Sequence, residues 1–238
     1  NFSGLDIFLL VTRRMTWLTT DKIPYFLLML DEADKFIESC ESVKYEPFDM
    51  LKEIQGIGER LRNTSMSETK LIALREAVNL AMSEEMRKDE NIFLMGEDVG
   101  IYGGDFGTSV GMLAEFGEKR VKDTPISEAA IAGAAVGSAI TGLRPIVDLT
   151  FMDFITIALD AIVNNGAKNN YMFGGGLKTP VTFRVASGSG IGSAAQHSQS
   201  LESWLTHIPG IKVVAPGNAN DAKGLLKSAI QDNNIVII

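Results

Sequence analysis

The stretch that decides the fold is DTPISEAAIAGAAVGSAITG, residues 123–142. Asp123 ends a segment of strand character, Pro125 marks a turn, and the residues that follow predict a helix. Most side chains of this helix are small. Because glycine costs up to about 1 kcal/mol relative to alanine in a helix interior, Gly133 and Gly137 predict a helix that another group approaches closely.

Glu128 is the only charged residue of the predicted helix and lies in its first turn. A carboxylate there complements the helix dipole, with Ser127 or Thr124 as the capping residue, and position alone favours that structural role. The functional alternative is a carboxylate at a strand-to-helix turn, beside a surface of small side chains that leaves room for a flat ligand. Position and spacing do not decide between the two.

Outward from this stretch, helices and strands alternate through residues 66–238. The strands are continuous apolar runs, which are typical of a parallel sheet covered on both faces. We therefore predict an α/β fold with a doubly wound parallel sheet, whose sites form in the loops at the carboxyl ends of the strands. The predicted strands are 92–95, 120–123, 144–150, 181–185, 211–215 and 235–238, and the predicted helices are 71–86, 112–116, 128–141, 154–167, 201–205 and 220–230.

Residues 1–65 differ in character from the rest of the chain. Segments 24–41 and 47–61 have helical spacing of apolar residues, and no glycine-rich loop or site motif accompanies them. From Met66 onward the pattern becomes regular. We therefore expect two parts, a mostly helical extension over residues 1–65 without assigned chemistry and one domain over residues 66–238.

The composition excludes several classes of protein. The net charge of the 238 residues is −8, and no patch rich in lysine and arginine occurs, which argues against nucleic acid as a partner. No apolar run reaches the length that spans a membrane. The single cysteine, Cys40, excludes an internal disulfide and fits a reducing compartment, so we expect a cytoplasmic protein.

Three further groups of residues are candidates for chemistry. Residues 103–107, GGDFG, match neither phosphate-binding glycine pattern, which favours a flexible surface loop. His197, within QHSQS at 196–200, is either a general acid–base or part of a polar surface loop, and no nucleophile elbow accompanies it to suggest a hydrolase. Phe151 and Phe154 follow a predicted strand, where each either packs in the core or presents a ring for stacking.

Several motifs of the chain occur together in a fixed order. They are GEDVGIYGG (96–104), DTPISE (123–128), GLRP (142–145), FMDF (151–154), AKNNYM (167–172), AQHSQS (195–200), HIPGIKVV (207–214) and DAKGLL (221–226). This series resembles the beta subunits of the thiamine diphosphate-dependent component of 2-oxo acid dehydrogenase complexes. Residues 104–112 and 200–204 are most similar to the acetoin dehydrogenase branch. The resemblance covers residues 66–238 and leaves out residues 1–65.

The resemblance implies a transketolase-like pyrimidine-binding fold and a set of site residues. Glu128 matches the glutamate that bonds N1′ of the cofactor's aminopyrimidine, and Ile126 matches the residue whose carbonyl accepts from the 4′-amino group. Phe154 matches the residue that packs against the pyrimidine ring. His197 matches the histidine that lines the substrate side and assists proton handling or acyl transfer to lipoamide. In some relatives a potassium ion is held mostly by backbone oxygens, at positions matching Val181, Ala229, Ile230, Asp232 and Asn234.

The resemblance also implies partners. The chain lacks the Gly-Asp-Gly motif and following asparagine that hold magnesium and the diphosphate, so a separate alpha subunit is expected to supply them in an α2β2 heterotetramer. The family's C-terminal domain, which helps bind the dihydrolipoamide acyltransferase core, would follow Ile238 and is absent. We expect an oxidoreductase acting on acetoin or a 2-oxo acid, inactive as the isolated chain. The alternatives are a pyruvate or branched-chain 2-oxo acid dehydrogenase beta subunit, or a non-catalytic remnant that acts only in assembly.

Overall fold

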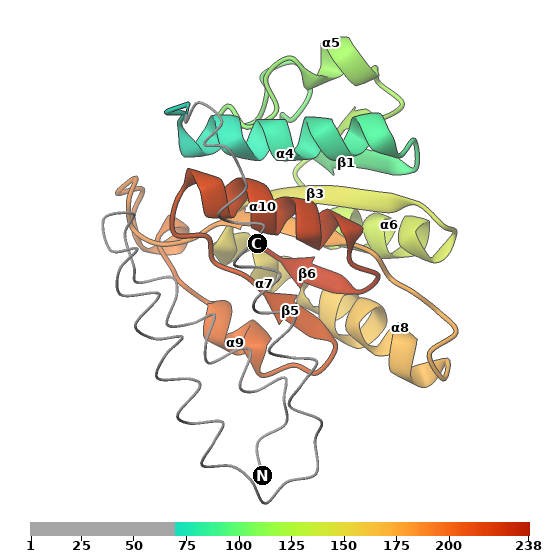
Figure 1. Cartoon of the computed structure of the whole chain (residues 1–238). Helices are drawn as coiled ribbons and strands as arrows, with labels where there is room; N and C mark the ends of the chain where they lie inside the picture. The colour runs from blue at the N-terminus through green and yellow to red at the C-terminus, as the bar shows by residue number, and fades with distance from the viewer. Residues whose placement is uncertain (1–69) are drawn as a thin grey trace, which may run out of the picture. The chain divides into compact units, whose positions relative to one another are not determined.

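The computed structural model describes residues 70–238, of which Ile72–Ile238 form one compact unit (Figure 1). The expectations for residues 1–65 lie outside the described residues. The unit is built on a six-stranded sheet in the order β2-β1-β3-β4-β6-β5, and every neighbouring pair is parallel. The predicted doubly wound parallel sheet is therefore confirmed.

The strands follow the predicted apolar runs closely. Strand β1 lies between β2 and β3, and β6 lies between β4 and β5. Both strands are buried along their whole length. The strands are β1 (Ile92–Gly96), β2 (Val121–Asp123), β3 (Arg144–Phe151), β4 (Thr182–Ala186), β5 (Ile211–Val213) and β6 (Ile235–Ile237).

Two hydrophobic cores lie on opposite faces of the sheet, as alternation along each strand requires. Leu94 and Ile146 point to the core under α4 and α10, whereas Phe93 and Val147 point to the core that α6 covers. Figure 1 shows α4 and α10 side by side on one face and α6 to α8 on the other. The helices are α4 (Leu74–Lys88), α5 (Met112–Phe116), α6 (Glu128–Ile140), α7 (Ile155–Leu159), α8 (Ala167–Met172), α9 (Glu202–Thr206) and α10 (Ala219–Gln231).

The helix predicted over residues 154–167 is less regular than expected. A 3-10 turn at Met152–Phe154 precedes α7, and a π-helical segment at Asp160–Gly166 separates α7 from α8. The backbone of Gly166 lies so close to Ile235 of β6 and Val136 of α6 that a Cβ there would overlap the isoleucine side chain. The segment is therefore packed tightly where its hydrogen-bond pattern changes.

The two ends of α6 differ in how their backbone groups are satisfied. Gly142 ends the helix with a φ of +102°, its N–H donates to the Ala139 carbonyl, and the Leu143 N–H donates to the Ser138 carbonyl. This pattern is a Schellman cap. At the other end the Ser127 side chain accepts no capping hydrogen bond, and its hydroxyl donates to the carbonyl of Pro125.

The small-residue face of α6 is open within the described domain. Gly133 and Gly137 are exposed, and a Cβ added at either would meet no atom within 4 Å. The close approach that the two glycines predict is therefore not made by residues 70–238.

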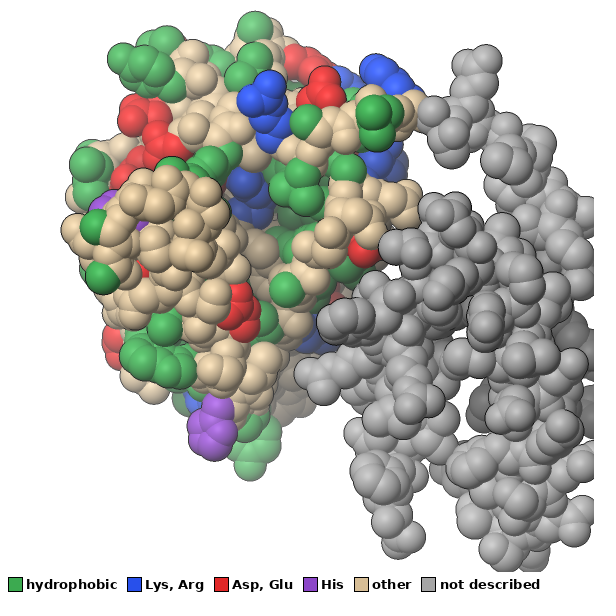
Figure 2. Space-filling model, turned by 90° about the vertical axis from the view of Figure 1, so that its left-hand side faces the viewer, with side chains coloured by type: hydrophobic (Ala, Val, Ile, Leu, Met, Phe, Trp, Pro, Cys, Tyr) green, Lys and Arg blue, Asp and Glu red, His purple; other side chains and the backbone are tan. Residues whose placement is uncertain are grey.

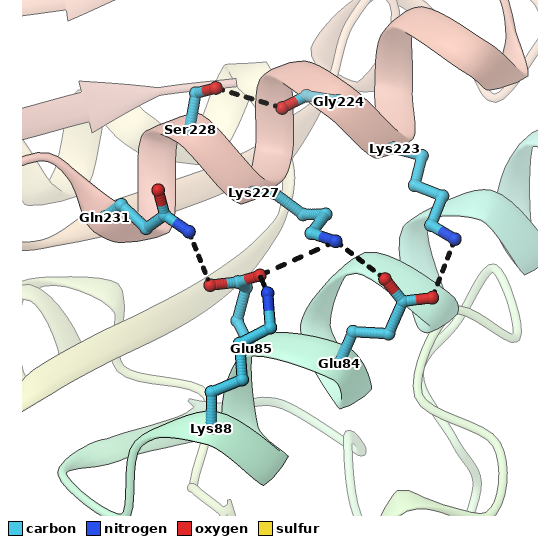
Figure 3. A network of polar contacts seen from close by, with 8 residues as sticks. All are labelled: Glu84, Glu85, Lys88, Lys223, Gly224, Lys227, Ser228 and Gln231. Carbon is cyan, nitrogen blue, oxygen red and sulfur yellow. Dashed lines mark hydrogen bonds and ion pairs between the residues drawn. The ribbon is translucent and has the colours of Figure 1, made fainter. Parts of the chain in front are cut away.

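A network of charged side chains joins α4 to α10 (Figure 3). The carboxylate of Glu84 accepts from Lys223 and Lys227, each at 2.7 Å. The carboxylate of Glu85 accepts from Lys88 at 2.6 Å and from Gln231 at 2.8 Å. The first helix of the described domain is in this way tied to the last one.

The network predicts a pH dependence of stability. Hydrogen bonds from Lys223 and Lys227 lower the pKa of Glu84 from 4.5 to about 2. A carboxyl group whose pKa is lower in the folded than in the unfolded protein stabilises the fold at any pH above its unfolded pKa. This stabilisation is lost as the pH falls toward the folded pKa. We expect Glu84→Gln to cost about 1 kcal/mol at pH 6. In urea titrations the difference from wild type should shrink below pH 4.5 and vanish near pH 2. The same substitution at the exposed Glu90 should show no such trend, and a pH-independent difference at Glu84 would contradict the prediction.

Candidate active and cofactor site

The residues predicted to act on the cofactor and the substrate follow the carboxyl ends of parallel strands, whereas the expected potassium positions do not. Glu128 begins α6 after β2, Phe154 comes after β3, and His197 lies in the loop after β4. These ends point to the left in Figure 1 and toward the viewer in Figure 2, where acidic and hydrophobic side chains both reach the surface. In open α/β sheets this edge is where ligands bind.

The structure brings Phe154 and His197 together in an aromatic cluster. The centroid of the His197 ring lies 5.2 Å from that of Phe154 and 4.9 Å from that of Phe151, in edge-to-face arrangements. Phe151 also packs edge-on against Phe106, at 5.5 Å. Phe154 remains partly exposed, so its ring is available for a further contact. The contribution of Phe106 could not be foreseen, because it comes from the distant loop after β1.

The backbone just before this cluster is strained. Thr150 has a φ of +61°, which is unusual for a β-branched residue, and its N–H donates to the Asp148 carboxylate at 3.0 Å. The pairing of β3 with β4 shifts register between Asp148 and Phe151. Asp148 is itself held by Arg184 of β4 at 2.5 Å. These contacts fix the turn from which Phe151 and Phe154 project.

Glu128 lies beside a second carboxyl group, that of Glu97 after β1. Only 5% of Glu128 is exposed, and no residue of the described domain donates a hydrogen bond to its carboxylate. Burial, and next the negative charge of Glu128, raise the pKa of Glu97, while a bond from the Ser127 N–H opposes them. One oxygen of Glu97 is buried with no partner within residues 70–238. Glu97 was not predicted as a site residue from the sequence, although it lies in the motif GEDVGIYGG at 96–104.

Ile126 lies at the exposed turn before Glu128. Its side chain is 82% exposed, and within residues 70–238 no backbone N–H donates to its carbonyl. The carbonyl is therefore free to accept a hydrogen bond from a ligand.

The glycine-rich loop is not the flexible surface loop that its sequence favours. Gly103 and Gly104 are buried, and the Ser109 N–H donates to the Gly103 carbonyl at 2.8 Å. The Ser109 hydroxyl donates to the Val99 carbonyl at 2.8 Å. The loop is folded against the end of β1, because a positive φ at Gly103 and Gly104 allows the tight return.

The positions expected to hold potassium have protein partners. The guanidinium of Arg144 donates to the carbonyls of Ile230 and Asp232, at 2.8 Å and 2.6 Å. The carbonyl of Ala229 accepts from the Asp232 N–H, that of Val181 accepts from the Val236 N–H, and the Asp232 carboxylate accepts from Lys212 and from the Asn234 N–H. The potassium site stays a prediction. No group of three or more metal-binding His, Cys, Asp or Glu side chains occurs within residues 70–238.

One cavity of the described domain adjoins the aromatic cluster through Phe106. It measures about 370 Å³ and is lined by Arg75, Thr108 and Arg184 among apolar side chains, with Phe106 at the border. Its lining does not include Ile126, Glu128, Phe154 or His197.

Comparison with known proteins defines the class of this domain. Residues 70–238 match the family model described as "Transketolase, pyrimidine binding domain", and the chain belongs to that family. A solved structure titled "Split gene transketolase, inactive beta4 tetramer" has the same fold, with a TM-score of 0.56 and 24% identity over 71% of this chain and 50% of that one.

Among curated proteins the chain is similar to beta subunits of two dehydrogenases. It is 45% identical over 188 residues to the human "Pyruvate dehydrogenase E1 component subunit beta, mitochondrial", a match that covers 79% of this chain and 52% of the relative. It is 50% identical over 179 residues to the Bacillus subtilis "Acetoin:2,6-dichlorophenolindophenol oxidoreductase subunit beta", covering 70% and 52%. The expected resemblance is confirmed. The chain spans about half the length of the curated relatives it matches.

The described residues also bear on a membrane role. Within residues 70–238 every helix is too short or too polar to cross a bilayer.

Proposed function

We propose that this chain contributes the pyrimidine-binding half of a thiamine diphosphate site, as the beta subunit of an acetoin or 2-oxo acid dehydrogenase. The observation that carries the proposal is Glu128, a buried carboxylate at the first turn of a small-residue helix. It lies in a domain of the transketolase pyrimidine-binding family, beside a second carboxyl group whose pKa is raised. Burying a carboxylate costs desolvation free energy, which complementing the helix dipole from an exposed position would not require.

The residues present fit an aminopyrimidine. Glu97 has a buried oxygen and His197 a buried Nδ1, neither with a partner within residues 70–238, and the carbonyl of Ile126 is free. Glu128 would hold a proton at N1′ of the ring, and Ile126 would accept from its 4′-amino group. The partly exposed ring of Phe154 would pack against the pyrimidine. When bound, the cofactor supplies the carbanion stabilisation that the cleavage of the substrate requires.

His197 would act on the substrate side of the same site. Its ring packs against Phe151 and Phe154, so it lies next to the surface that we assign to the cofactor. An imidazole can give or accept a proton near neutral pH, which suits proton handling and acyl transfer to lipoamide.

The proposal includes partners and a location. An alpha subunit would supply the magnesium and diphosphate sites in an α2β2 heterotetramer, and the acyltransferase core would accept the acyl group. The exposed side chain of Ile126, two residues before the buried Glu128, supports a site completed by another chain. We propose the cytoplasm as the compartment, since a single cysteine occurs in the sequence. A potassium ion at the expected backbone oxygens stays part of the proposal, with Arg144 donating to two of the same carbonyls.

Binding of thiamine diphosphate tests the division of the site. We expect no saturable binding to the isolated chain, and binding once the chain is co-expressed with its alpha subunit, because the diphosphate ligands lie on the partner. Isothermal titration with magnesium present measures both. Tight binding to the isolated chain would contradict the proposed division, whereas absence of binding to the assembled protein would contradict the proposed cofactor.

The substrate is tested on the same assembled protein. Reduction of a dye acceptor with acetoin, pyruvate or a branched-chain 2-oxo acid ranks the three candidates by kcat/KM. The resemblance of residues 104–112 and 200–204 to the acetoin branch favours acetoin, whereas overall identity does not separate the candidates, at 50% to the acetoin oxidoreductase subunit and 51% to a pyruvate dehydrogenase beta subunit of Rhizobium meliloti. Assembly without turnover of any of them would favour the non-catalytic alternative.

A further inference from the structure

One buried carboxylate links the two segments that form the aromatic cluster. Asp153, in the 3-10 turn after β3, is only 6% exposed. Its Oδ1 accepts from the side-chain amide of Gln199 at 2.6 Å, and both of its oxygens lie 3.4 Å from the Gln199 backbone nitrogen. Gln199 belongs to the loop after β4. Hydrogen bonds to a buried carboxylate are among the stronger ones that a protein makes.

Gln199 is also where the loop closes on itself. Its carbonyl accepts from the Gly188 N–H at 3.1 Å, which joins the two ends of the loop 188–199. The loop is otherwise largely exposed and rich in glycine and serine, and the Ser198 hydroxyl bonds locally, to the Ala194 carbonyl at 2.7 Å. Gln199 is therefore the point at which a long, polar loop is fixed to the end of β3.

His197 lies two residues before this point. Its ring touches Phe151 and Phe154, and its Nδ1 has no hydrogen-bond partner within the described residues. Catalytic histidines are commonly oriented by a hydrogen bond to the second ring nitrogen. Here the place of the ring depends on packing and on the course of the loop, and Asp153 sets that course through Gln199.

We propose that Asp153 is a positioning residue, which holds the imidazole of His197 over Phe151 and Phe154 through its two bonds with Gln199. The inference rests on the proposed function for its catalytic consequence, and on the geometry alone for the placement of the ring. Asp153 touches neither substrate nor cofactor in this role.

The test introduces a negative charge at position 199 and then exchanges the donor and acceptor side chains between positions 153 and 199. Gln199→Glu places a second carboxylate against Asp153 and breaks the side-chain bond. The double variant Asp153→Asn, Gln199→Glu restores it with donor and acceptor exchanged. Gln196→Glu adds the same charge to the same loop, at an exposed residue one position before His197, and serves as the matched control.

The readout is the NMR signal of the His197 ring in the full chain. The sequence contains two histidines, so His207→Gln assigns both ring signals. Rings packed edge-on shift each other's resonances. We expect the shift of the His197 signal from its free position to be lost in Gln199→Glu, kept in Gln196→Glu, and regained in the double variant. An unmoved His197 signal in Gln199→Glu, or an equal loss in Gln196→Glu, would overturn the proposal.

Activity of the chain assembled with its alpha subunit distinguishes the placement of the His197 ring from the catalytic role of His197. A misplaced catalytic group can cost about 10² in rate, so we expect Gln199→Glu to lower kcat by about that factor with KM little changed. The double variant should recover most of the loss. If the His197 signal moves but acyl transfer does not slow, the positioning role stands and the proposed catalytic role of His197 fails.

Discussion

Glutamine at position 128 is expected to lower the turnover of the assembled enzyme by roughly 10²–10⁴, the range that general acid–base catalysis supplies. The amide has nearly the volume of the carboxylate, but it cannot exchange a proton with N1′ of the pyrimidine. Since Glu128 is buried at the start of α6, a neutral side chain of the same shape should leave the fold and the assembly intact. Dye-coupled turnover at saturating substrate and cofactor measures the loss, and size-exclusion chromatography checks the assembly.

Two further variants make this result specific. Glu118→Gln removes a carboxylate from an exposed turn and should leave turnover unchanged. Glu97→Gln removes the neighbouring carboxyl group, and we expect a smaller loss than at Glu128. Normal turnover of Glu128→Gln would contradict the assignment, and a larger loss at Glu97 would transfer the proton-holding role to that residue.

The largest loss of stability is expected from Arg184→Met. Arg184 and Asp148 form an ion pair of 2.5 Å between adjacent strands, with 12% and 9% of their side chains exposed. Removing one partner of a buried pair leaves an uncompensated charge and typically costs about 3–5 kcal/mol. Urea denaturation of the full chain should show this loss. The turn at Thr150 should loosen as well, because its N–H bonds to the same aspartate.

An exposed pair of equal length provides the control. Arg87 and Glu115 also lie 2.5 Å apart, but 52% and 40% of their side chains are exposed. Exposed pairs contribute about 0–1 kcal/mol, so Arg87→Met should scarcely change the free energy of unfolding. Similar losses for the two arginine variants would show that burial does not decide the strength of these pairs.

The fold could be predicted from the sequence because its signals are local. Continuous apolar runs such as Ile92–Gly96 and the Schellman glycine at Gly142 depend on residues close in sequence. The π-helical segment at Asp160–Gly166 could not be predicted, since its tight packing involves Ile235, far along the chain. The capping bond predicted for Ser127 is wrong, since its side chain accepts from no helix N–H and is turned toward the carbonyl of Pro125.

The candidate site, like the fold, could be predicted only in part from the sequence. Glu128 and His197 stand in recognisable motifs, although position alone favoured a structural role for the glutamate. The partners of these residues come from distant loops: Glu97 from the end of β1, Phe106 from the glycine-rich loop, and Asp153 through Gln199. Short sequence patterns do not predict these contacts, because they form only when the parallel strands place their carboxyl ends along one edge of the sheet.

The carboxyl groups gathered at this edge also give the domain an electrical polarity. Burial and the negative charges of Glu128, Asp105 and Asp98 raise the pKa of Glu97, and burial with the charges of Asp98 and Asp148 raises the pKa of Asp105. Such a field attracts a cationic ring and repels a diphosphate. We infer that one end of the cofactor is drawn to this surface while the other end is driven from it. The molecule would thus be oriented before any specific contact forms, with its anionic end toward the partner subunit.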